Sequence, residues 1–145
     1  MLRQSAFQDC KNLKRVRLNE GLEVLGTDDR PDGKYWCGVF RGSAVEDVFL
    51  PSTLRRIEYD TFAECKRLKS IILPERLECI RRNSFRGSAL ESVFLPNMLK
   101  IIEDSTFFKC ETLKSVVFPN ALEKIGDFAF FRSGLENVKF PPSLR

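Results

Sequence analysis

The cysteines are the residues of this chain with the clearest capacity for chemistry, as nucleophiles or as metal ligands. The 145 residues include five cysteines and no histidine. Without histidine the chain lacks the commonest general acid–base residue and the commonest protein ligand of metals. No two cysteines have the Cys-x-x-Cys spacing that is typical of zinc sites, so we expect no bound zinc. The sequence therefore offers thiols but no neighbouring group that would activate one.

Carboxylates are the second group with capacity for chemistry. Asp28, Asp29 and Asp32 lie close together and could contact a cation, but they lack the spacing and the closing glutamate of an EF-hand. No phosphate-binding loop and no pair of carboxylates in one frame occurs elsewhere in the sequence. We therefore predict no metal site and no cofactor, and we predict that the chain is not an enzyme.

Charge and hydropathy restrict the kinds of partner. The net charge of +4 arises from 24 basic and 20 acidic residues, which are interleaved along the chain. A group of arginines that includes Arg55, Arg81 and Arg86 is broken up by acids, so we expect no nucleic-acid binding. No run of 18 apolar residues is present, and the first five residues contain no signal-peptide core, so we expect no membrane insertion. The cellular location stays open on this evidence.

The elements that would position any site are repeats. Phenylalanine recurs at intervals of 22, 23, 22 and 23 residues, at positions Phe40, Phe62, Phe85, Phe107 and Phe130, and Phe7 precedes Phe40 by 33. The repeating unit reads Phe-x-x-Cys-x-x-Leu-x-x-Val-x-Leu-Pro-x-x-Leu-x-x-Ile. A repeat of this length cannot bury its apolar side alone, so successive copies must stack. The sequence predicts one solenoid over 1-145, with about six repeats and an inserted loop at 27-37.

Two kinds of repeat alternate. The longer kind has cysteine three residues after the phenylalanine, as at Cys10, Cys65 and Cys110. The shorter kind has Arg-Gly-Ser or Phe-Arg-Ser there. Equivalent cysteines would lie two turns, or roughly 10 Å, apart, which is too far for a disulfide, so we expect them to be small buried side chains.

The same unit predicts the strands. The last apolar positions of Leu-x-x-Val-x-Leu alternate with a period of two, as in a β-strand, and the following proline ends the strand because it cannot donate to the ladder. The Leu-x-x-Ile segment lines the opposite wall, and the small-Phe step fills the space between the walls. Phe108 and Phe131 are expected to pack between turns, and the alternative is that they form a small apolar patch on the convex side. The predicted class is an α/β-type repeat that is mostly β, with a parallel sheet along one wall.

This unit resembles the BspA-like, Treponema-type leucine-rich repeat, and the stretch from Ile125 to Phe130 is the copy with the most similar sequence. The resemblance covers nearly the whole chain, although the glycine after isoleucine is missing from several repeats. It implies a leucine-rich repeat solenoid and, because family members are found on bacterial and protist surfaces, a surface or secreted location and adhesion. Both ends of the chain interrupt a repeat. We therefore expect a fragment of a longer protein, or ends that a partner covers.

The outward positions of the predicted sheet form columns. The first of these positions alternates in sign across the repeats, through Lys14, Glu46, Lys69, Glu91, Lys114 and Glu136, which indicates a ladder of cross-strand ion pairs. A second alternating series, on the other wall, contains Glu23, Arg55, Glu78, Lys100 and Glu123. A third column, between the valine and leucine positions, contains Arg17, Phe49, Ile72, Phe94, Val117 and Lys139.

Four apolar residues in that third column would form an exposed stripe with a basic residue at each end. Contiguous exposed apolar patches are typical of interaction sites, and aromatic anchors are typical of binding hot spots. The alternatives are that β-propensity alone favours these residues, or that a flanking segment covers them. We predict that the chain binds a protein partner through this face. The competing hypothesis is a structural subunit that associates with itself.

The insertion is the second candidate for recognition. It combines a turn-forming stretch with Tyr35 and with Trp36, the one tryptophan of the chain. Loops inserted into a regular scaffold often carry specificity, so Tyr35 and Trp36 join the predicted partner-binding residues. The alternative is a tolerated loop with Trp36 docked on the core.

Overall fold

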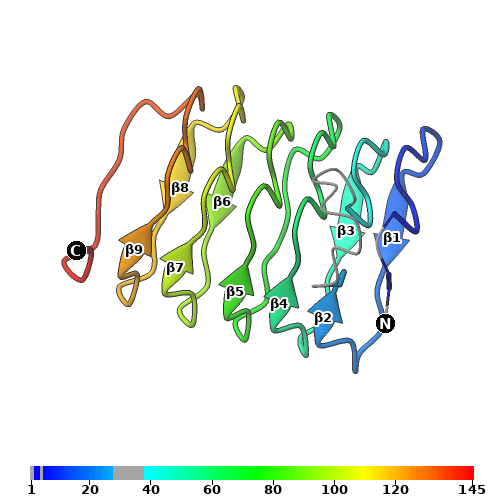
Figure 1. The fold of residues 1–145 in the computed structure, drawn as a ribbon, viewed down its shortest axis with the longest axis horizontal. Coiled ribbons are helices and arrows are strands. Elements are labelled where there is room, and N and C mark those ends of the chain that lie inside the picture. The colour runs from blue at the N-terminus through cyan, green and yellow to red at the C-terminus, as the bar shows by residue number, and fades with distance from the viewer. Residues whose placement is uncertain (1, 4, 28–37) are drawn as a thin grey trace.

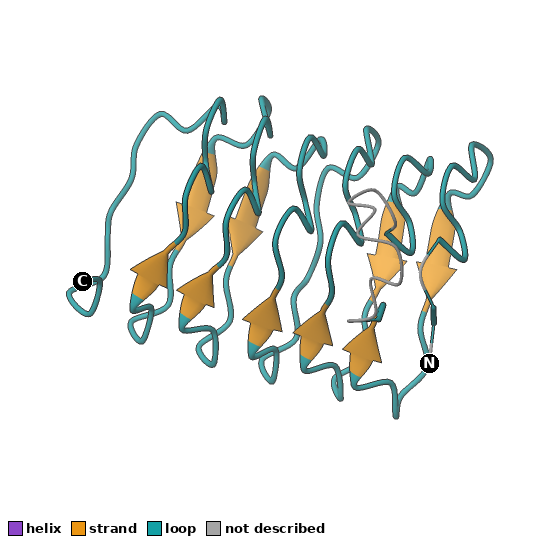
Figure 2. Cartoon of the chain, in the orientation of Figure 1, coloured by secondary structure: helices purple, strands orange, loops and turns teal. Residues whose placement is uncertain are grey.

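The computed structural model describes residues 2–3, 5–27 and 38–145, which form a series of stacked coils with the two termini at opposite ends (Figure 1). The described residues contain nine short β-strands and no helix (Figure 2). The strands are β1 (Arg15–Arg17), β2 (Val24–Leu25), β3 (Asp47–Phe49), β4 (Arg56–Ile57), β5 (Cys79–Ile80), β6 (Ser92–Phe94), β7 (Ile101–Ile102), β8 (Ser115–Val117) and β9 (Lys124–Ile125). The predicted repeat solenoid, mostly β, is confirmed.

Parallel sheets lie on two walls of the solenoid. On the first wall, which carries the predicted strands, β1 pairs with β3 and β6 pairs with β8. On the second wall β2, β4, β5, β7 and β9 form one five-stranded parallel sheet. Figure 1 shows the two rows of strands. The sequence pattern identified the first wall as a sheet, but the unbroken ladder lies on the second wall.

The first wall is interrupted in the third repeat. Residues 70–72 pair with neither β3 nor β6, although the neighbouring Glu91 amide donates to the Lys69 carbonyl over 2.9 Å. The side chains nevertheless keep their alternation, because Ile71 and Leu73 are buried whereas Ile72 is 87% exposed. The outward columns therefore continue across the gap in the ladder.

The core is organised around a column of phenylalanine rings. Phe7, Phe40, Phe62, Phe85, Phe107 and Phe130 stack in order, with ring centroids 5.2–5.5 Å apart and interplanar angles of 4–11°. The four central rings are fully buried. The repeat spacing of this one residue type thus fixes the register of neighbouring coils.

The turn that follows each core phenylalanine uses left-handed backbone. The second residue after the phenylalanine has a positive φ in each of the repeats, at Asp9, Gly42, Glu64, Gly87, Lys109 and Arg132. L-residues pay about 1–2 kcal/mol for this conformation, whereas glycine does not. The shorter repeats with Arg-Gly-Ser therefore form this turn without strain.

Gly87→Ala should lower the free energy of unfolding by about 1–2 kcal/mol. Gly87 has φ of +62°, and an added Cβ would lie 2.6 Å from a carboxylate oxygen of Glu64. The matched control is Lys109→Gly, at the equivalent turn position of the next repeat, with φ of 57°. It should cause no loss of stability. Urea denaturation of both variants tests this, and an equal loss in both would show that the left-handed turn is not responsible.

Candidate functional site

The outward face of the first wall carries a row of exposed apolar side chains. We define the apolar stripe as Phe49, Ile72, Phe94 and Val117, with exposed fractions of 48%, 87%, 70% and 50%. Strand register places Phe49 beside Arg17 and places Phe94 beside Val117. Their neighbours in sequence, such as Val48 and Val93, point inward and are buried. The stripe is thus a consequence of strand alternation on a wall whose inner side is the core.

Three of the predicted partner-binding residues meet at a groove. A groove of about 530 Å³ lies between β3 and residues 70–72, where the ladder is interrupted, and its lining includes Arg17, Phe49 and Ile72. The Arg17 guanidinium carbon lies 4.5 Å from the centre of the Phe49 ring, as in a cation–π contact. Buried Val48 and Ile71 form part of its lining. The groove therefore has apolar side chains in its lining together with charged side chains of both signs.

The remaining predicted residues extend this site or lie elsewhere. Phe94 and Val117 continue the stripe on β6 and β8, beyond the groove. Lys139 is exposed in the sixth repeat, where residues 136–140 form no strand. Tyr35 and Trp36, like most of the 27-37 insertion and its three aspartates, lie outside the described residues.

Charged side chains flank the stripe. We call the first outward position of each repeat the charge column, formed by Lys14, Glu46, Lys69, Glu91, Lys114 and Glu136. Lys69 pairs with Glu91 at 3.4 Å and Lys114 pairs with Glu136 at 3.7 Å, as the alternation predicts. Glu46 pairs instead with Arg67 at 3.3 Å. These side chains are largely exposed, so each pair contributes little stability, and the column mainly sets the electrostatic pattern of the face.

Between the charge column and the apolar stripe lies a column of small polar residues. We call Ser70, Ser92 and Ser115 the serine column, and Ser92 is in strand register with Ser115. In the first two repeats Arg15 and Asp47 take this place and form an ion pair of 2.9 Å. Because serine side chains are short, the apolar side chains of the stripe project further from the sheet than the serine column does.

The second wall carries its own ion pairs. Arg55 pairs with Glu78 at 2.5 Å, and Lys100 pairs with Glu123 at 3.4 Å, in agreement with the second alternating series. Arg82 also contacts an acid, Asp104, at 2.5 Å. Arginines that are paired with acids in this way offer little to a nucleic-acid backbone.

A charged cluster that the repeat pattern did not reveal lies inside the second wall. Glu58 and Asp60 are 1% and 2% exposed. Arg56 contacts Glu58 at 2.5 Å, and Arg81 lies between Glu58 and Glu103, at 3.8 Å and 2.9 Å. In three repeats a charged residue occupies the position where the family unit has glycine, and these residues are Glu58, Arg81 and Glu103. The absence of glycine at this position was therefore a signal in the sequence for this column of charges.

Glycine at either end of that column leaves room for it. A Cβ on Gly26 would lie 2.8 Å from the Cβ of Glu58, and a Cβ on Gly126 would lie 2.4 Å from a carboxylate oxygen of Asp104. The buried acids are thus neutralised by arginines and packed against glycines. This arrangement is typical of a structural ion network.

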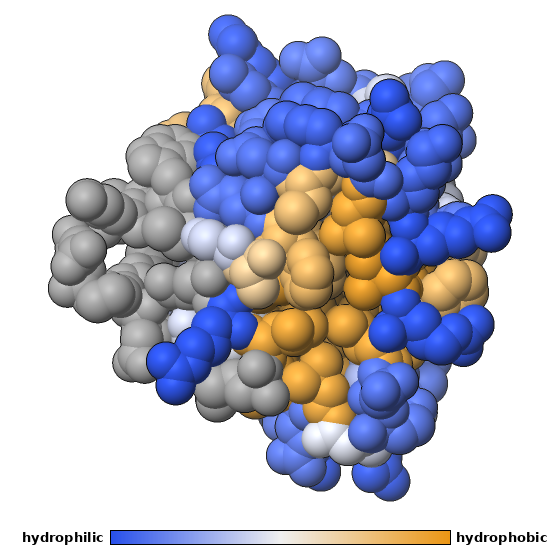
Figure 3. Space-filling view, turned by 90° about the vertical axis from the view of Figure 1, so that its right-hand side faces the viewer, coloured by the Kyte–Doolittle hydropathy of each residue, from blue (hydrophilic) through white to orange (hydrophobic). Residues whose placement is uncertain are grey.

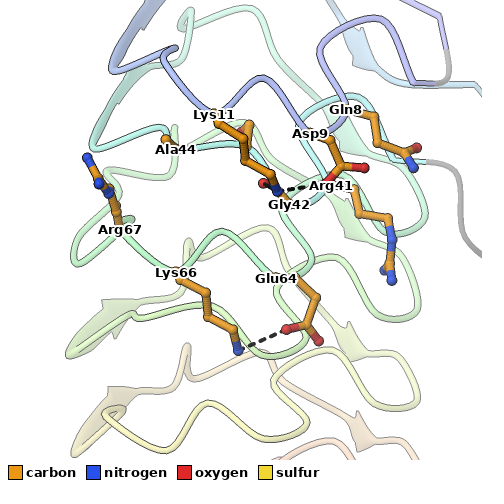
Figure 4. A pocket seen from close by; sticks show the side chains of 10 residues that line it. Gln8, Asp9, Lys11, Arg41, Gly42, Ala44, Glu64, Lys66 and Arg67 are labelled. Carbon is orange, nitrogen blue, oxygen red and sulfur yellow. Dashed lines mark hydrogen bonds and ion pairs between the residues drawn. The ribbon is translucent and has the colours of Figure 1, made fainter.

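A polar pocket of about 670 Å³ lies along the turn edge of the solenoid (Figure 4). Its charged side chains already serve the fold. Lys11 pairs with Asp9 at 2.9 Å and donates to the Gly42 carbonyl, and Lys66 pairs with Glu64 at 2.8 Å and donates to the Gly87 carbonyl. Within the described residues, no group of three or more Cys, Asp or Glu side chains is arranged to hold a metal ion.

Two cysteines of the longer repeats, Cys65 and Cys110, are buried as expected, whereas Cys10 of the first repeat is only partly buried. The two buried thiols have a specific hydrogen-bonding role. The Cys65 thiol donates to the Phe40 carbonyl over 3.1 Å and lies 3.8 Å from the Ser43 hydroxyl. The Cys110 thiol donates to the Phe85 carbonyl over 3.0 Å and lies 3.5 Å from the Ser88 hydroxyl. The cysteine of a longer repeat and the serine of the preceding shorter repeat therefore form one structural pair, which explains their alternation.

Cys65 should make stability fall with rising pH. Burial raises the pKa of the Cys65 thiol from 9.0 to about 12. Above about pH 9 the unfolded chain loses this proton while the folded chain keeps it, so unfolding becomes more favourable by up to about 1.4 kcal/mol per pH unit. We expect the stability of wild type to fall more steeply between about pH 8 and pH 10.5 than that of Cys65→Ala, measured by urea denaturation. Parallel curves would contradict a buried neutral thiol.

Two further apolar surfaces are visible. The Phe108 and Phe131 rings stack at 5.3 Å, which confirms their packing between turns, while Phe131 remains 46% exposed. Figure 3 shows the N-terminal end of the coil, where an apolar area is bordered by hydrophilic residues. Leu13, Val16 and Leu18 of the first repeat are only partly buried against the core. The apolar stripe differs from both, because it lies on a strand-supported face.

No helix among the described residues is long and apolar enough to span a membrane.

A family model described as BspA type leucine rich repeat region, with six copies, matches residues 1–28 and 37–145. The gap between the two matched ranges coincides with most of the predicted insertion. No curated protein matches the chain in a comparison of sequences.

Solved structures share the fold. A leucine-rich repeat protein from Bacteroides ovatus is 22% identical with a TM-score of 0.68, over 97% of this chain and 46% of that one. The leucine-rich repeat protein of T. pallidum is 27% identical with a TM-score of 0.71, over 86% and 61%. A leucine-rich cell surface protein from Faecalibacterium prausnitzii is 20% identical with a TM-score of 0.52, over 98% and 45%. This chain spans about half to three fifths of the length of these neighbours.

Proposed function

We propose that this chain, which belongs to the BspA type leucine-rich repeat family, is a non-catalytic module that binds another protein through the outward face of its first wall. Leucine-rich repeats generally mediate protein–protein interaction. The observation that carries the proposal is the apolar stripe, four side chains in successive repeats that are 48–87% exposed. Water contact with so much contiguous apolar surface is unfavourable, and a partner that covers it gains hydrophobic free energy.

The surroundings of the stripe support a protein partner. The groove between Phe49 and Ile72 has apolar lining for a side-chain anchor, and the charge column supplies a polar rim. Hot spots at protein interfaces combine a desolvated apolar centre with such a rim. A rigid scaffold of stacked coils would present these groups with little loss of conformational entropy on binding.

Catalysis has no comparable support. The sequence contains no histidine. The buried thiol of Cys65 has a raised pKa, so it is held as the unreactive thiol at neutral pH. The buried acids are neutralised by arginines. We therefore assign binding and not chemistry to the face.

A photo-crosslinking residue in place of Ile72 tests the proposal. The matched control position is Ile101, an outward apolar residue of β7 on the second wall that is 47% exposed. Cells that express both variants are irradiated, and adducts are identified by mass spectrometry. We expect a protein adduct from position 72 that is absent from position 101 and that forms again with the purified partner. Equal adducts from the two positions, or adducts from position 101 alone, would contradict this assignment of the face.

We also propose that the partner lies outside the cell, where the face would act in adhesion. The neighbour from Faecalibacterium prausnitzii is described as a cell surface protein. Treatment of intact cells with a protease should then remove the chain while it spares a cytoplasmic marker. Protection from the protease in intact cells would place the interaction elsewhere and leave the binding face itself unaffected.

A further inference from the structure

The sign pattern of the charge column restricts what can pack on this face. Lysine stands in the first, third and fifth repeats, and glutamate stands in the second, fourth and sixth. Lys69 and Glu91, at the centre, have 73% and 60% of their side-chain surface exposed. The charges of this column pair with one another along the chain, and a partner that covers the apolar stripe gains further attraction when its own charges alternate with the spacing of one strand and with opposite sign at each step.

This chain itself presents such a pattern. A two-fold axis parallel to the strands, placed midway between two neighbouring repeats, brings the face of a second copy onto the first. Each column then lies over the same column of the other copy, with the order of repeats reversed. If the repeats are numbered from one to six along the chain, an odd-numbered repeat always faces an even-numbered repeat of the other copy. Every lysine of the charge column therefore faces a glutamate. A two-fold axis along the solenoid would instead place the charge columns on opposite sides of the stripe.

The apolar stripe selects one position of this axis. The stripe occupies the second to fifth repeats, so its midpoint lies between Ile72 and Phe94. With the axis there, Ile72 faces Phe94 of the other copy and Phe49 faces Val117. In the charge column Lys69 faces Glu91, and Glu46 faces Lys114. The serine column at the centre has short side chains, which permit the two faces to approach closely.

We propose that the partner bound by this face is a second copy of the same chain, related by a two-fold axis parallel to the strands between Ile72 and Phe94. This inference rests on the proposed function, since it uses the same face. Such an interface is isologous, as in most dimers of identical subunits. Shifting the axis onto a strand makes every facing pair in the charge column alike in sign, so the charges restrict the axis to positions between strands, and the apolar stripe selects one of these positions.

The arrangement has one unfavourable pair, at the rim. Arg17 would face Lys139 of the other copy. Arg17 is already engaged with the ring of Phe49 at 4.5 Å, and both side chains are long, exposed and free to move toward water. Rim charges contribute little to affinity, so the apolar centre and the inner charge pairs decide the association.

Sedimentation equilibrium of the purified chain, from about 1 μM to about 500 μM, tests the inference. We expect a reversible monomer–dimer equilibrium in wild type. Lys69→Glu places a glutamate opposite Glu91 twice in each dimer, and should raise the dissociation constant by at least about tenfold. The double variant Lys69→Glu with Glu91→Lys exchanges the signs, restores opposite charges across the axis, and should recover most of the affinity. The second-wall variant Ile101→Asp should dimerise as wild type does.

Three outcomes would overturn the inference. A monomer at all concentrations excludes the second copy as partner, and the proposed function then stands or falls separately on the crosslink from position 72. A dimer that survives Ile72→Asp does not use this face. A dimer that Ile72→Asp abolishes but that Lys69→Glu leaves unchanged lacks the proposed register. If Lys69→Glu does not fold, as judged by circular dichroism, Glu46→Lys with and without Lys114→Glu provides the same comparison at the neighbouring pair.

Discussion

Phe85→Ala is expected to lower the free energy of unfolding by about 3–5 kcal/mol, which is a large share of the stability of a domain of this size. Phe85 is fully buried, and its ring stacks on Phe62 at 5.4 Å and on Phe107 at 5.5 Å. Alanine would remove the ring from both contacts and leave a cavity that stacked coils cannot close without losing their register. Urea denaturation followed by circular dichroism measures the difference.

Phe7→Ala is the matched control for Phe85→Ala. Phe7 belongs to the same column, but it is 36% exposed and stacks only on Phe40, at 5.4 Å. Its removal should therefore cost well under half as much. Since each coil of a solenoid contacts only its neighbours, a cavity in the middle also separates the two halves. Equal losses in the two variants would contradict the stacked column as the main source of stability.

The phenylalanine column is the part of the fold that the sequence predicts best. One bulky residue type recurs at 22 or 23 residues, so only a coil of that length brings the rings together. The outward position of Ile72 was predictable for a related reason. Side chains of extended backbone alternate between two faces whether or not the strand is hydrogen-bonded, and Ile72 points outward where the ladder is broken.

Hydrogen-bond pairing was less predictable than side-chain direction. Both walls consist of short extended segments with inward apolar residues, and the sequence does not show which wall forms a continuous hydrogen-bonded sheet. The second wall does, from β2 to β9. This sheet and the column of phenylalanine rings together hold the coils in register. The third repeat can therefore lack strand pairing on the first wall. The groove beside Ile72 lies at that gap, and the residue pattern contains no sign of it.

Buried charge was missed because it looks like surface charge in a sequence. Glu58 follows Arg55 and Arg56, of which Arg55 is exposed, and it precedes Asp60, which is buried as well. The burial of these charges is related to a change in the repeat. At a position where the backbone turns against the core, three repeats have a charged residue in place of glycine, namely Glu58, Arg81 and Glu103. Where a repeat loses a glycine, the new side chain must lie in the layer between coils, and a column of alternating charge is one way to fill it.

Ile72→Asp should weaken binding of the partner isolated through the position 72 crosslink by at least about 30-fold, which corresponds to about 2 kcal/mol. Ile72 is 87% exposed in the chain alone. The substitution should therefore leave the unfolding free energy within about 0.5 kcal/mol of wild type. In the complex, an aspartate at this place would be buried against apolar surface without a hydrogen-bonding partner, which is strongly unfavourable. Isothermal titration calorimetry measures the affinity, and urea denaturation measures the stability.

Ile101→Asp separates the effect of the face from the effect of adding a carboxylate to a sheet. Ile101 is also an outward isoleucine on a parallel strand, and it is 47% exposed on the second wall. If the first wall is the binding face, this variant keeps the affinity of wild type, although it changes net charge by the same amount. If both variants lose affinity equally, the loss reflects charge or folding and the apolar stripe is not the site. If neither loses affinity, the partner binds outside both sheets, and the exposure of the stripe must have another cause.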